Sequence, residues 1–159
     1  DAIDISFLCN TSTVNEVVFP PYSTVIVFVP ETENDTIEQP NPDDIILELD
    51  TFFKQKLEII YKYGLNDVIL DIGFGFGKDT LQNLELIKNL RHFAHFGYEI
   101  LVGASRKRTI GDIVQKDTKD RLIGSLALHQ YAILNGASII RTHDVIEHID
   151  MLKILKALD

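Results

Sequence analysis

Residues 68–78 read VILDIGFGFGK, a short apolar run that passes into a glycine-rich loop. Together with the residue before it, the run predicts a strand over 67–71 that ends on the carboxylate of Asp71. The three glycines that alternate in the loop permit positive φ values and a close approach of the backbone to a ligand. The two phenylalanines between them offer flat apolar faces, which would be costly to expose on an ordinary surface loop.

The loop matches neither of the common phosphate-binding fingerprints. Asp79 follows Gly77-Lys78 where a P-loop has Ser or Thr, and Ile72 stands in the place of the leading glycine. The glycine spacing also differs from the Gly-x-Gly-x-x-Gly pattern of dinucleotide-binding turns. We expect Lys78 to face the solvent, and a flexible surface loop is the alternative to a binding loop.

On both sides of this stretch the same unit recurs: a β-rich run with a polar end, an amphipathic helix and a glycine. Strands that alternate with helices indicate βαβ units and a parallel sheet. The pattern alone leaves open a doubly wound sheet and a (β/α)8 barrel. It favours the open sheet, because a barrel needs eight units and we count four. We predict strands over 24–29, 67–71, 99–103 and 138–141, and helices over about 45–60, 81–90, 119–134 and 145–155.

The composition is that of a globular protein with a core, since 45% of the 159 residues are hydrophobic and 25% are charged. The formal net charge of −9 argues against a nucleic-acid or anionic membrane surface. Residues 30–44 form an acidic, proline-containing loop, and no apolar run approaches the length of a membrane span. The single cysteine, Cys9, cannot form an internal disulfide, which fits a reducing cytoplasm.

The uncommon polar residues of the chain fall where the predicted strands end. Asp71 ends the second strand, and residues 105–107 (Ser-Arg-Lys) follow the third. Arg141 and His143 come at the end of the fourth. Ligands of parallel sheets bind at the carboxyl ends of the strands, and two basic clusters on one rim repel each other unless an anion joins them. Ordinary surface charge explains any one of these residues equally well, but the set favours an anion site beside the helix N-terminus that follows His143.

His92 and His95 lie three residues apart on a predicted helix. A zinc site would need more ligands nearby. We therefore expect a solvated pair of histidines and name no metal ligand in this chain.

Five segments stand in order along the chain: LDIGFGFGK at 70–78, NLEL at 83–86, VGASRK at 102–107, RLIGSL at 121–126 and RTHDV at 141–145. Taken together, and in this order, they resemble dihydropteroate synthase. The resemblance implies an α/β fold, the C-terminal half of a (β/α)8 TIM barrel with parallel strands and outer helices. Residues 1–159 would be one partial barrel domain, from about strand four at Ile3-Asp4-Ile5 to helix eight, without the first three strands.

The resemblance also implies an activity and a set of site residues. A dihydropteroate synthase is a transferase of folate biosynthesis that condenses 6-hydroxymethyl-7,8-dihydropterin pyrophosphate with p-aminobenzoate and releases pyrophosphate. By position, Asp71 and Lys107 would bind the pterin, Phe76 and Lys107 would line the p-aminobenzoate pocket, and Arg141 and His143 would hold the pyrophosphate. Lys107 is the catalytic candidate.

The family further implies Mg²⁺ bound with the pyrophosphate, through a ligand in the missing N-terminal half. It implies a cytoplasmic homodimer that pairs through its last helices and has no nucleic-acid or membrane partner. A fragment without the first strands is expected to be inactive alone.

The chain departs from the family at several positions. Ile3 stands where the family has a pterin-binding Asn, and Val29-Pro30 stands near its Met-His. Ile72 replaces Pro, and Arg108 replaces a common Ser. Two alternatives stay open: a related pterin-binding methyltransferase barrel, and a non-catalytic pterin-binding or dimerisation module. The Ser-Arg-Lys and Arg-x-His segments favour the synthase, because methyl transfer has no pyrophosphate to hold.

Overall fold

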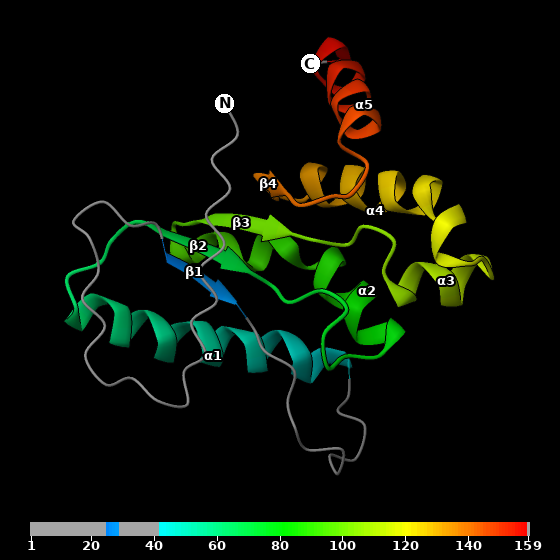
Figure 1. Cartoon of the computed structure of the whole chain (residues 1–159). Coiled ribbons are helices and arrows are strands. Elements are labelled where there is room, and N and C mark those ends of the chain that lie inside the picture. The colour runs from blue at the N-terminus through cyan, green and yellow to red at the C-terminus, as the bar shows by residue number, and fades with distance from the viewer. Residues whose placement is uncertain (1–24, 29–41, 159) are drawn as a thin grey trace.

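The computed structural model describes residues 25–28 and 42–158 (Figure 1). Strands and helices alternate along the chain, as the sequence predicts. The elements are β1 (Val25–Phe28), α1 (Pro42–Lys62), β2 (Val68–Asp71), α2 (Thr80–Lys88), the 3-10 helix η1 (Leu90–Phe96), β3 (Glu99–Val102), α3 (Arg108–Val114), the 3-10 turn η2 (Thr118–Asp120), α4 (Leu122–Leu134), β4 (Ile139–Ile140) and α5 (Val145–Leu158).

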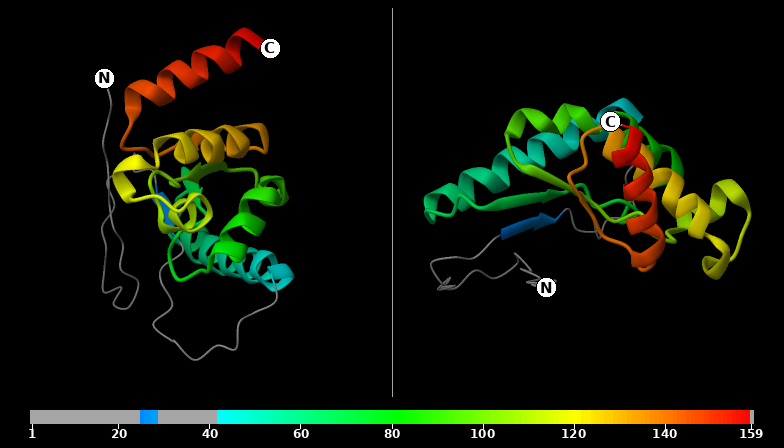
Figure 2. Two further views of the ribbon diagram at one scale, coloured as in Figure 1. Left: turned by 90° about the vertical axis from the view of Figure 1, so that its right-hand side faces the viewer. Right: turned by 90° about the horizontal axis from the view of Figure 1, so that it is seen from above.

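The strands form one parallel sheet in which spatial order follows chain order, β1-β2-β3-β4. Val27 pairs with Leu70, Leu70 with Ile100, and Leu101 with Ile139. Helices α1, α2 and α4 lie on one side of this sheet (Figure 2). A doubly wound sheet reverses its strand order and carries helices on both faces, whereas a barrel wall does neither. The described residues therefore form part of a (β/α)8 barrel, and the open sheet favoured by periodicity alone is wrong.

The core lies between the strands and the helix layer. Helix α1 carries apolar residues at a three-to-four spacing and buries the face that they form, with Leu49 2% and Phe53 0% exposed. The ring of Phe53 meets the ring of Phe93 edge to face, with centroids 5.7 Å apart. Helix α1 ends where Gly64 takes a positive φ of 73° and its N–H bonds to the carbonyl of Tyr61.

The second helix differs from its prediction in length and in buried face. Helix α2 stops at Lys88, where the N–H of Asn89 caps the carbonyl of Glu85, and the chain continues as η1. Leu81 is 66% exposed, while Asn83 is 1% exposed. Hydrophobic periodicity correctly finds Ile87 and Leu90, which are 2% and 0% exposed, but it cannot find Asn83 because it does not register a buried amide.

The helix predicted over 119–134 is also wrong at its start. Residues 108–114 form a separate short helix, α3, and α4 begins only at Leu122. Gln115 ends α3 in the left-handed region with φ of 55°. Gly124 allows α4 to pack on α3, since a Cβ at this position would stand 2.3 Å from Cγ2 of Ile110.

Helix α5 projects away from the body of the molecule (Figures 1 and 2). His148 is its one buried residue, and most of its large apolar side chains are exposed. The exposed large apolar residues of α5 are Val145, Ile146, Ile149, Leu152, Ile154 and Leu158. Within the described ranges, no helix combines the length and the apolar character needed to cross a membrane.

Candidate active site at the strand ends

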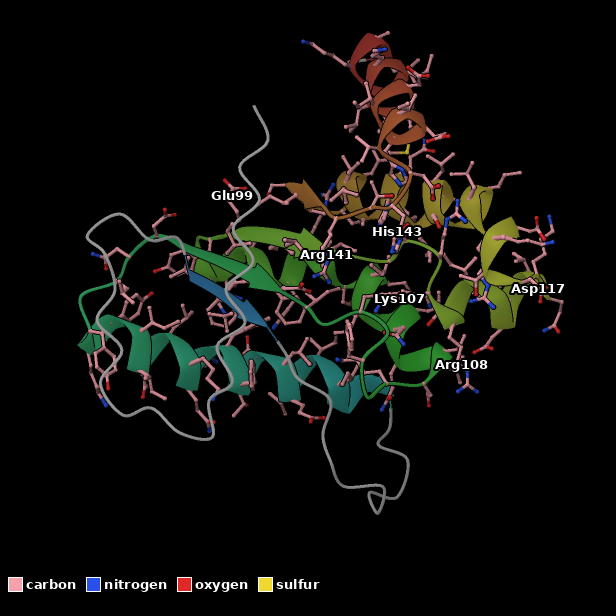
Figure 3. All side chains as sticks on the ribbon, in the orientation of Figure 1. Glu99, Lys107, Arg108, Asp117, Arg141 and His143 are labelled. Carbon is pink, nitrogen blue, oxygen red and sulfur yellow. The ribbon has the colours of Figure 1, made fainter. Side chains whose placement is uncertain are left out.

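The sequence-predicted site residues meet at the carboxyl end of the sheet. Figure 3 shows Lys107, Arg141 and His143 in one region beyond β3, with Glu99 at the opposite end of that strand. Asp71 closes β2 at the same end, because the strands are parallel and Asp71 pairs with Leu101 of β3. The expected rim is therefore confirmed as an arrangement of residues.

Asp71 forms the floor of this rim. Its side chain is 2% exposed, and Oδ1 accepts the N–H of Gly73 at 2.9 Å. Oδ2 lies 3.5 Å from Nη2 of Arg141. Burial raises the pKa of the Asp71 carboxyl above its ordinary value, although the hydrogen bond from Gly73 and the charge of Arg141 act in the opposite direction. A buried carboxylate that points to a cationic rim is a strong acceptor for ligand N–H groups.

The glycine loop is held from beneath rather than left flexible. All three of its glycines have positive φ, 64°, 78° and 58° in chain order. The amide of Asn83 accepts the N–H of Gly75 at 2.7 Å and donates to the carbonyls of Lys78 and Asp79. The buried asparagine of α2 therefore sets the path of the loop.

Lys78 also braces the loop, so the prediction that it faces the solvent is wrong. Its Nζ donates to the carbonyls of Gly73 and Phe76, each at 3.1 Å. Burial lowers the pKa of the Lys78 ammonium to about 8, although the carboxylates of Glu48 and Asp71 act in the opposite direction. The lysine thus supplies a hydrogen-bond donor to backbone carbonyls that the tight loop turns inward.

The two phenylalanines of the loop have different roles. Phe74 is 1% exposed and belongs to the core, so it is not the ligand-facing ring that the sequence allowed for. Phe76 is half-buried at the rim, and Nζ of Lys107 lies 3.5 Å from the centre of its ring. Of the two rings, Phe76 is the one that can line a ligand pocket.

Two glycines make room for the rim cations. A Cβ on Gly75 would stand 2.9 Å from Cδ of Lys107, and a Cβ on Gly103 would stand 2.9 Å from Nε and from Nη2 of Arg141. The long side chains thus lie flat on the backbone and place their charges above Asp71. This contact explains why glycine occupies position 103 directly after β3.

Ser105 ties the loop after β3 to the loop after β4. Ser105 as a whole is 5% exposed. Its hydroxyl oxygen accepts the N–H of His143 at 3.2 Å and lies 3.0 Å from Nδ1 of the same histidine. The hydroxyl of Thr142 donates to Ser105 at 3.3 Å. His143 itself is exposed, with its ring anchored and its other ring nitrogen available to a ligand.

The basic run 106–108 does not act as one cluster. Arg106 forms a two-point ion pair with Asp144, and this contact lowers the pKa of the aspartate. The side chain of Arg108 is 92% exposed and lies 3.7 Å from Asp112. Lys107 is thus the member of the run that reaches the site.

Arg121 supports the site without entering it, and its role was not predicted. Its guanidinium donates to the carbonyls of Arg106 at 3.2 Å, Lys107 at 3.3 Å and Lys116 at 2.9 Å. Ser125, one turn along α4, accepts the N–H of Arg106 at 2.8 Å. The Arg-Leu-x-Gly-Ser motif, 121–125, therefore fixes the backbone that carries Lys107.

A buried histidine pair connects the same loops through the core. Nε2 of His129 accepts the N–H of Ala104 at 2.9 Å, which places the ring proton on Nδ1, 2.7 Å from Nε2 of His148. Nδ1 of His148 then donates to the carbonyl of Asp144 at 2.7 Å. Burial, with the nearby His148, lowers the pKa of His129 to about 4, so the ring is neutral.

The described rim does not offer a ligand set for Mg²⁺. Magnesium prefers several oxygen ligands in octahedral geometry, and Asp71 is the one carboxylate on the floor of this part of the rim. Both of its oxygens are engaged, by Gly73 and by Arg141. The expected Mg²⁺ ligand, like the departures at Ile3 and Val29, lies outside the described residues.

Comparisons with known proteins point to one family. The sequence model of the family described as pterin binding enzyme matches residues 9–143. A bifunctional dihydropteroate synthase/dihydropteroate reductase of Helicobacter pylori is 49% identical over 135 residues, 85% of this chain and 36% of the relative. The dihydropteroate synthase of Escherichia coli K12 is 38% identical over 122 residues, 76% of this chain and 43% of the relative.

Solved structures agree with the sequence relatives. Dihydropteroate synthase from Stenotrophomonas maltophilia, with imidazole bound in its active site, is 34% identical with a TM-score of 0.78, and the match covers 85% of this chain and 52% of that one. A Xanthomonas albilineans dihydropteroate synthase with 4-aminobenzoic acid is 30% identical with a TM-score of 0.76, over 85% of this chain and 49% of that one. This chain therefore spans between 36% and 52% of the length of these four relatives.

Proposed function

The chain belongs to the family of pterin-binding enzymes, and on that premise we propose that it supplies the C-terminal half of the active site of a dihydropteroate synthase. The arylamine nitrogen of p-aminobenzoate attacks the methylene carbon of the pterin substrate. A C–N bond forms, the C–O bond to pyrophosphate breaks, and the amine loses a proton. Positioning the two substrates and stabilising the departing anion are the main demands on the protein.

Asp71 and Lys107 bind the pterin in this proposal. The Asp71 carboxylate, buried and fixed by Gly73, accepts hydrogen bonds from the ring N–H and amino groups. Lys107 donates to the ring oxygen from above. The close approach of Arg141 to Asp71, 3.5 Å between Nη2 and Oδ2, is the observation that carries the proposal, because it joins the pterin end of the rim to its anion end.

The p-aminobenzoate pocket lies between Phe76 and Lys107. The ring of Phe76 gives an apolar wall, and the ammonium of Lys107, 3.5 Å from the ring centre, faces the same space. An aromatic carboxylate needs both a flat apolar contact and a cation. The 4-aminobenzoic acid bound to the Xanthomonas relative supports this second substrate.

Arg141 and His143 hold the leaving pyrophosphate. Arg141 supplies a permanent charge, and Ser105 fixes the His143 ring through Nδ1. Helix α5 begins two residues after His143, with its free N–H groups near the same point. The pyrophosphate contacts favour a synthase over the methyltransferase alternative, which has no such anion to hold.

The wider setting of the enzyme belongs to the same proposal. Mg²⁺ accompanies the pyrophosphate through residues outside the described part of the chain. The protein is a cytoplasmic homodimer that pairs through its last helices, which is supported by the exposed apolar residues of α5. Residues 1–159 alone show no turnover, because half of the rim is absent.

The test is dihydropteroate formation by the complete protein and its Lys107→Met variant. Methionine keeps the apolar packing against Phe76 and removes the charge, so kcat/KM should fall roughly 10²–10³-fold, as for other lost electrostatic contacts to a reacting group. Lys153→Met, at an exposed lysine paired with Asp150 on α5, is the matched control and should leave kcat/KM unchanged. A parent that forms no dihydropteroate, or a Lys107→Met variant as active as the parent, refutes the proposal.

A further inference from the structure

Two imidazoles and a carboxylate meet on the helix layer of the molecule, outside the strand-end site. Asp50 comes from α1, and His92 and His95 come from η1, which leads into the amino end of β3. That end, marked by Glu99 in Figure 3, is opposite to the one that carries Lys107 and His143. The synthase mechanism uses none of these three residues.

Both histidines point their Nε2 atoms at the same carboxylate oxygen. Oδ1 of Asp50 lies 3.2 Å from Nε2 of His92 and 3.1 Å from Nε2 of His95. One ligand atom from each residue lies within 4.8 Å of the other two. In a tetrahedral zinc site with bonds of about 2.0–2.1 Å, neighbouring ligand atoms lie about 3.3 Å apart. The two carboxylate–imidazole spacings therefore have the size that one metal ion requires.

The hydrogen bonds orient His95 as a metal ligand. Its Nδ1 lies 2.6 Å from the carbonyl of His92, and a carbonyl only accepts, so Nδ1 carries a proton. In the neutral ring the lone pair of Nε2 then faces Oδ1 of Asp50, and either a proton or a metal ion between these two atoms would stabilise the contact. A backbone carbonyl bonded to the outer nitrogen is also the usual way in which a metal-binding imidazole is held.

Packing holds both rings in place before any ion arrives. The His92 ring meets Phe93 edge to face with centroids 5.3 Å apart, and the His95 ring lies against Phe96 at 4.0 Å. Asp50 is 5% exposed, whereas the two histidine side chains are 46% and 45% exposed. The ligand atoms are thus positioned by the core and remain reachable from the solvent.

Lys54 is the neighbour that an ion would have to tolerate. Its Nζ lies 2.5 Å from Oδ2 of Asp50, so it occupies the other carboxylate oxygen and leaves Oδ1 to the histidines. The lysine side chain is 60% exposed and can turn into the solvent. It therefore acts either as an outer partner of the carboxylate or as a competitor that withdraws when a metal binds.

We propose that Asp50, His92 and His95 bind one zinc ion, with water as the fourth ligand. Two imidazoles and one carboxylate suit zinc and its transition-metal neighbours better than Mg²⁺ or Ca²⁺, which prefer oxygen ligands alone. The site joins α1 to η1, so the ion stabilises the packing of these two elements. The proposal differs from the expectation of a solvated histidine pair, because Asp50 is a further potential ligand that the sequence did not place beside the histidines.

Zinc titration of the metal-free complete protein, followed by calorimetry and by metal analysis, tests the site. One zinc per chain is expected, and His92→Gln and His95→Gln should each bind more than about 10-fold more weakly, since even an outer partner of a metal site is worth that much. Lys54→Met keeps all three ligands and should bind zinc at least as tightly as the parent. His143→Gln removes a histidine elsewhere and should leave zinc binding unchanged.

Cobalt(II) gives a second readout, which reports coordination geometry and does not depend on synthase activity. A tetrahedral cobalt site absorbs visible light strongly, and this absorption should appear in the parent and vanish in the His92→Gln, His95→Gln double variant. Both histidines are half-exposed, so the double variant should keep the circular dichroism of the fold. A parent without stoichiometric zinc, or a double variant that binds zinc as tightly as the parent, overturns the proposal and leaves an ion-pair network around Asp50.

Discussion

The guanidinium of Arg141 lies across the backbone of Gly103: a Cβ on Gly103 would stand 2.9 Å from both Nε and Nη2 of Arg141. The glycine is therefore part of the proposed anion site, although it offers no side chain to a ligand. Because position 103 has no Cβ, the guanidinium of Arg141 can lie in this place.

Gly103→Ala should fold and bind pyrophosphate more weakly. The added methyl meets the flexible end of Arg141, which moves away and loses a charge-assisted contact worth roughly 1.5–3 kcal/mol. Arg141→Ala should lose a similar amount, and adding Gly103→Ala to it should cost little more, because the two changes remove one contact. Calorimetric titration of pyrophosphate at fixed salt measures all four proteins. Additive losses would show that Gly103 acts independently of Arg141.

Lys78→Met should loosen the glycine loop and change the pH dependence of stability. The pKa of Lys78 is about 8 in the folded chain against an ordinary 10.5, so the unfolded chain binds more protons between these values. The free energy of unfolding should therefore rise as pH increases from about 8 to 10.5. In Lys78→Met this rise should flatten. Lys88→Met, at an exposed lysine on α2, is the control and should keep it. Denaturant titrations at several pH values make the comparison.

His129 should make the protein less stable in mild acid. Its pKa of about 4 lies below the ordinary 6.5, so the unfolded chain again binds more protons between the two values. Stability should increase with pH from about 4 to 6.5 and then level off, as far as this residue is concerned. His129→Gln can still accept the N–H of Ala104 but does not titrate, so part of that slope should disappear. An unchanged slope in thermal or denaturant unfolding would locate the effect in other groups.

Ile154→Lys should weaken self-association of the protein. Ile154 is 65% exposed on α5, and a lysine there places a charge in an apolar contact between copies. Leu81→Lys is the matched control, since Leu81 is 66% exposed on α2, away from the last helices. Sedimentation should show a shift toward monomer in Ile154→Lys only. A dimer that survives this change would mean that α5 packs against the rest of its own barrel.

Much of the rim could be predicted because the carboxyl ends of parallel strands must share an edge. That rule, together with the motifs that resemble the synthases, predicts that Asp71, Lys107 and Arg141 lie together. The roles of Asn83 and Lys78 could not be predicted, because periodicity records apolar residues and both act through hydrogen bonds to the backbone of the loop.

The meeting of Asp50 with His92 and His95 lies beyond sequence reasoning for a different reason. It depends on how α1 and η1 pack across the core, where Phe53 and Phe93 set the approach. The spacing of the three residues along the chain gives no information about how α1 packs against η1. Periodicity does not predict the short helix α3 either, because the helix ends at Gln115, a non-glycine residue in the left-handed region with φ of 55°. Packing inside it is close: a Cβ on Gly111 would stand 2.2 Å from Nη2 of Arg121.

The hydrogen bonds of Arg121 to the carbonyls of Arg106 and Lys107 bear on how natural variants of this protein should be read. The height of Lys107 above Phe76 depends on a residue that the proposed substrates do not touch. A change at position 121 can alter the fit of p-aminobenzoate, or of a compound that imitates it, while every pocket side chain keeps its identity. A survey of variants restricted to positions that contact the ligand would overlook such a change. Position 121 should therefore be sequenced and tested together with the ligand-contacting positions.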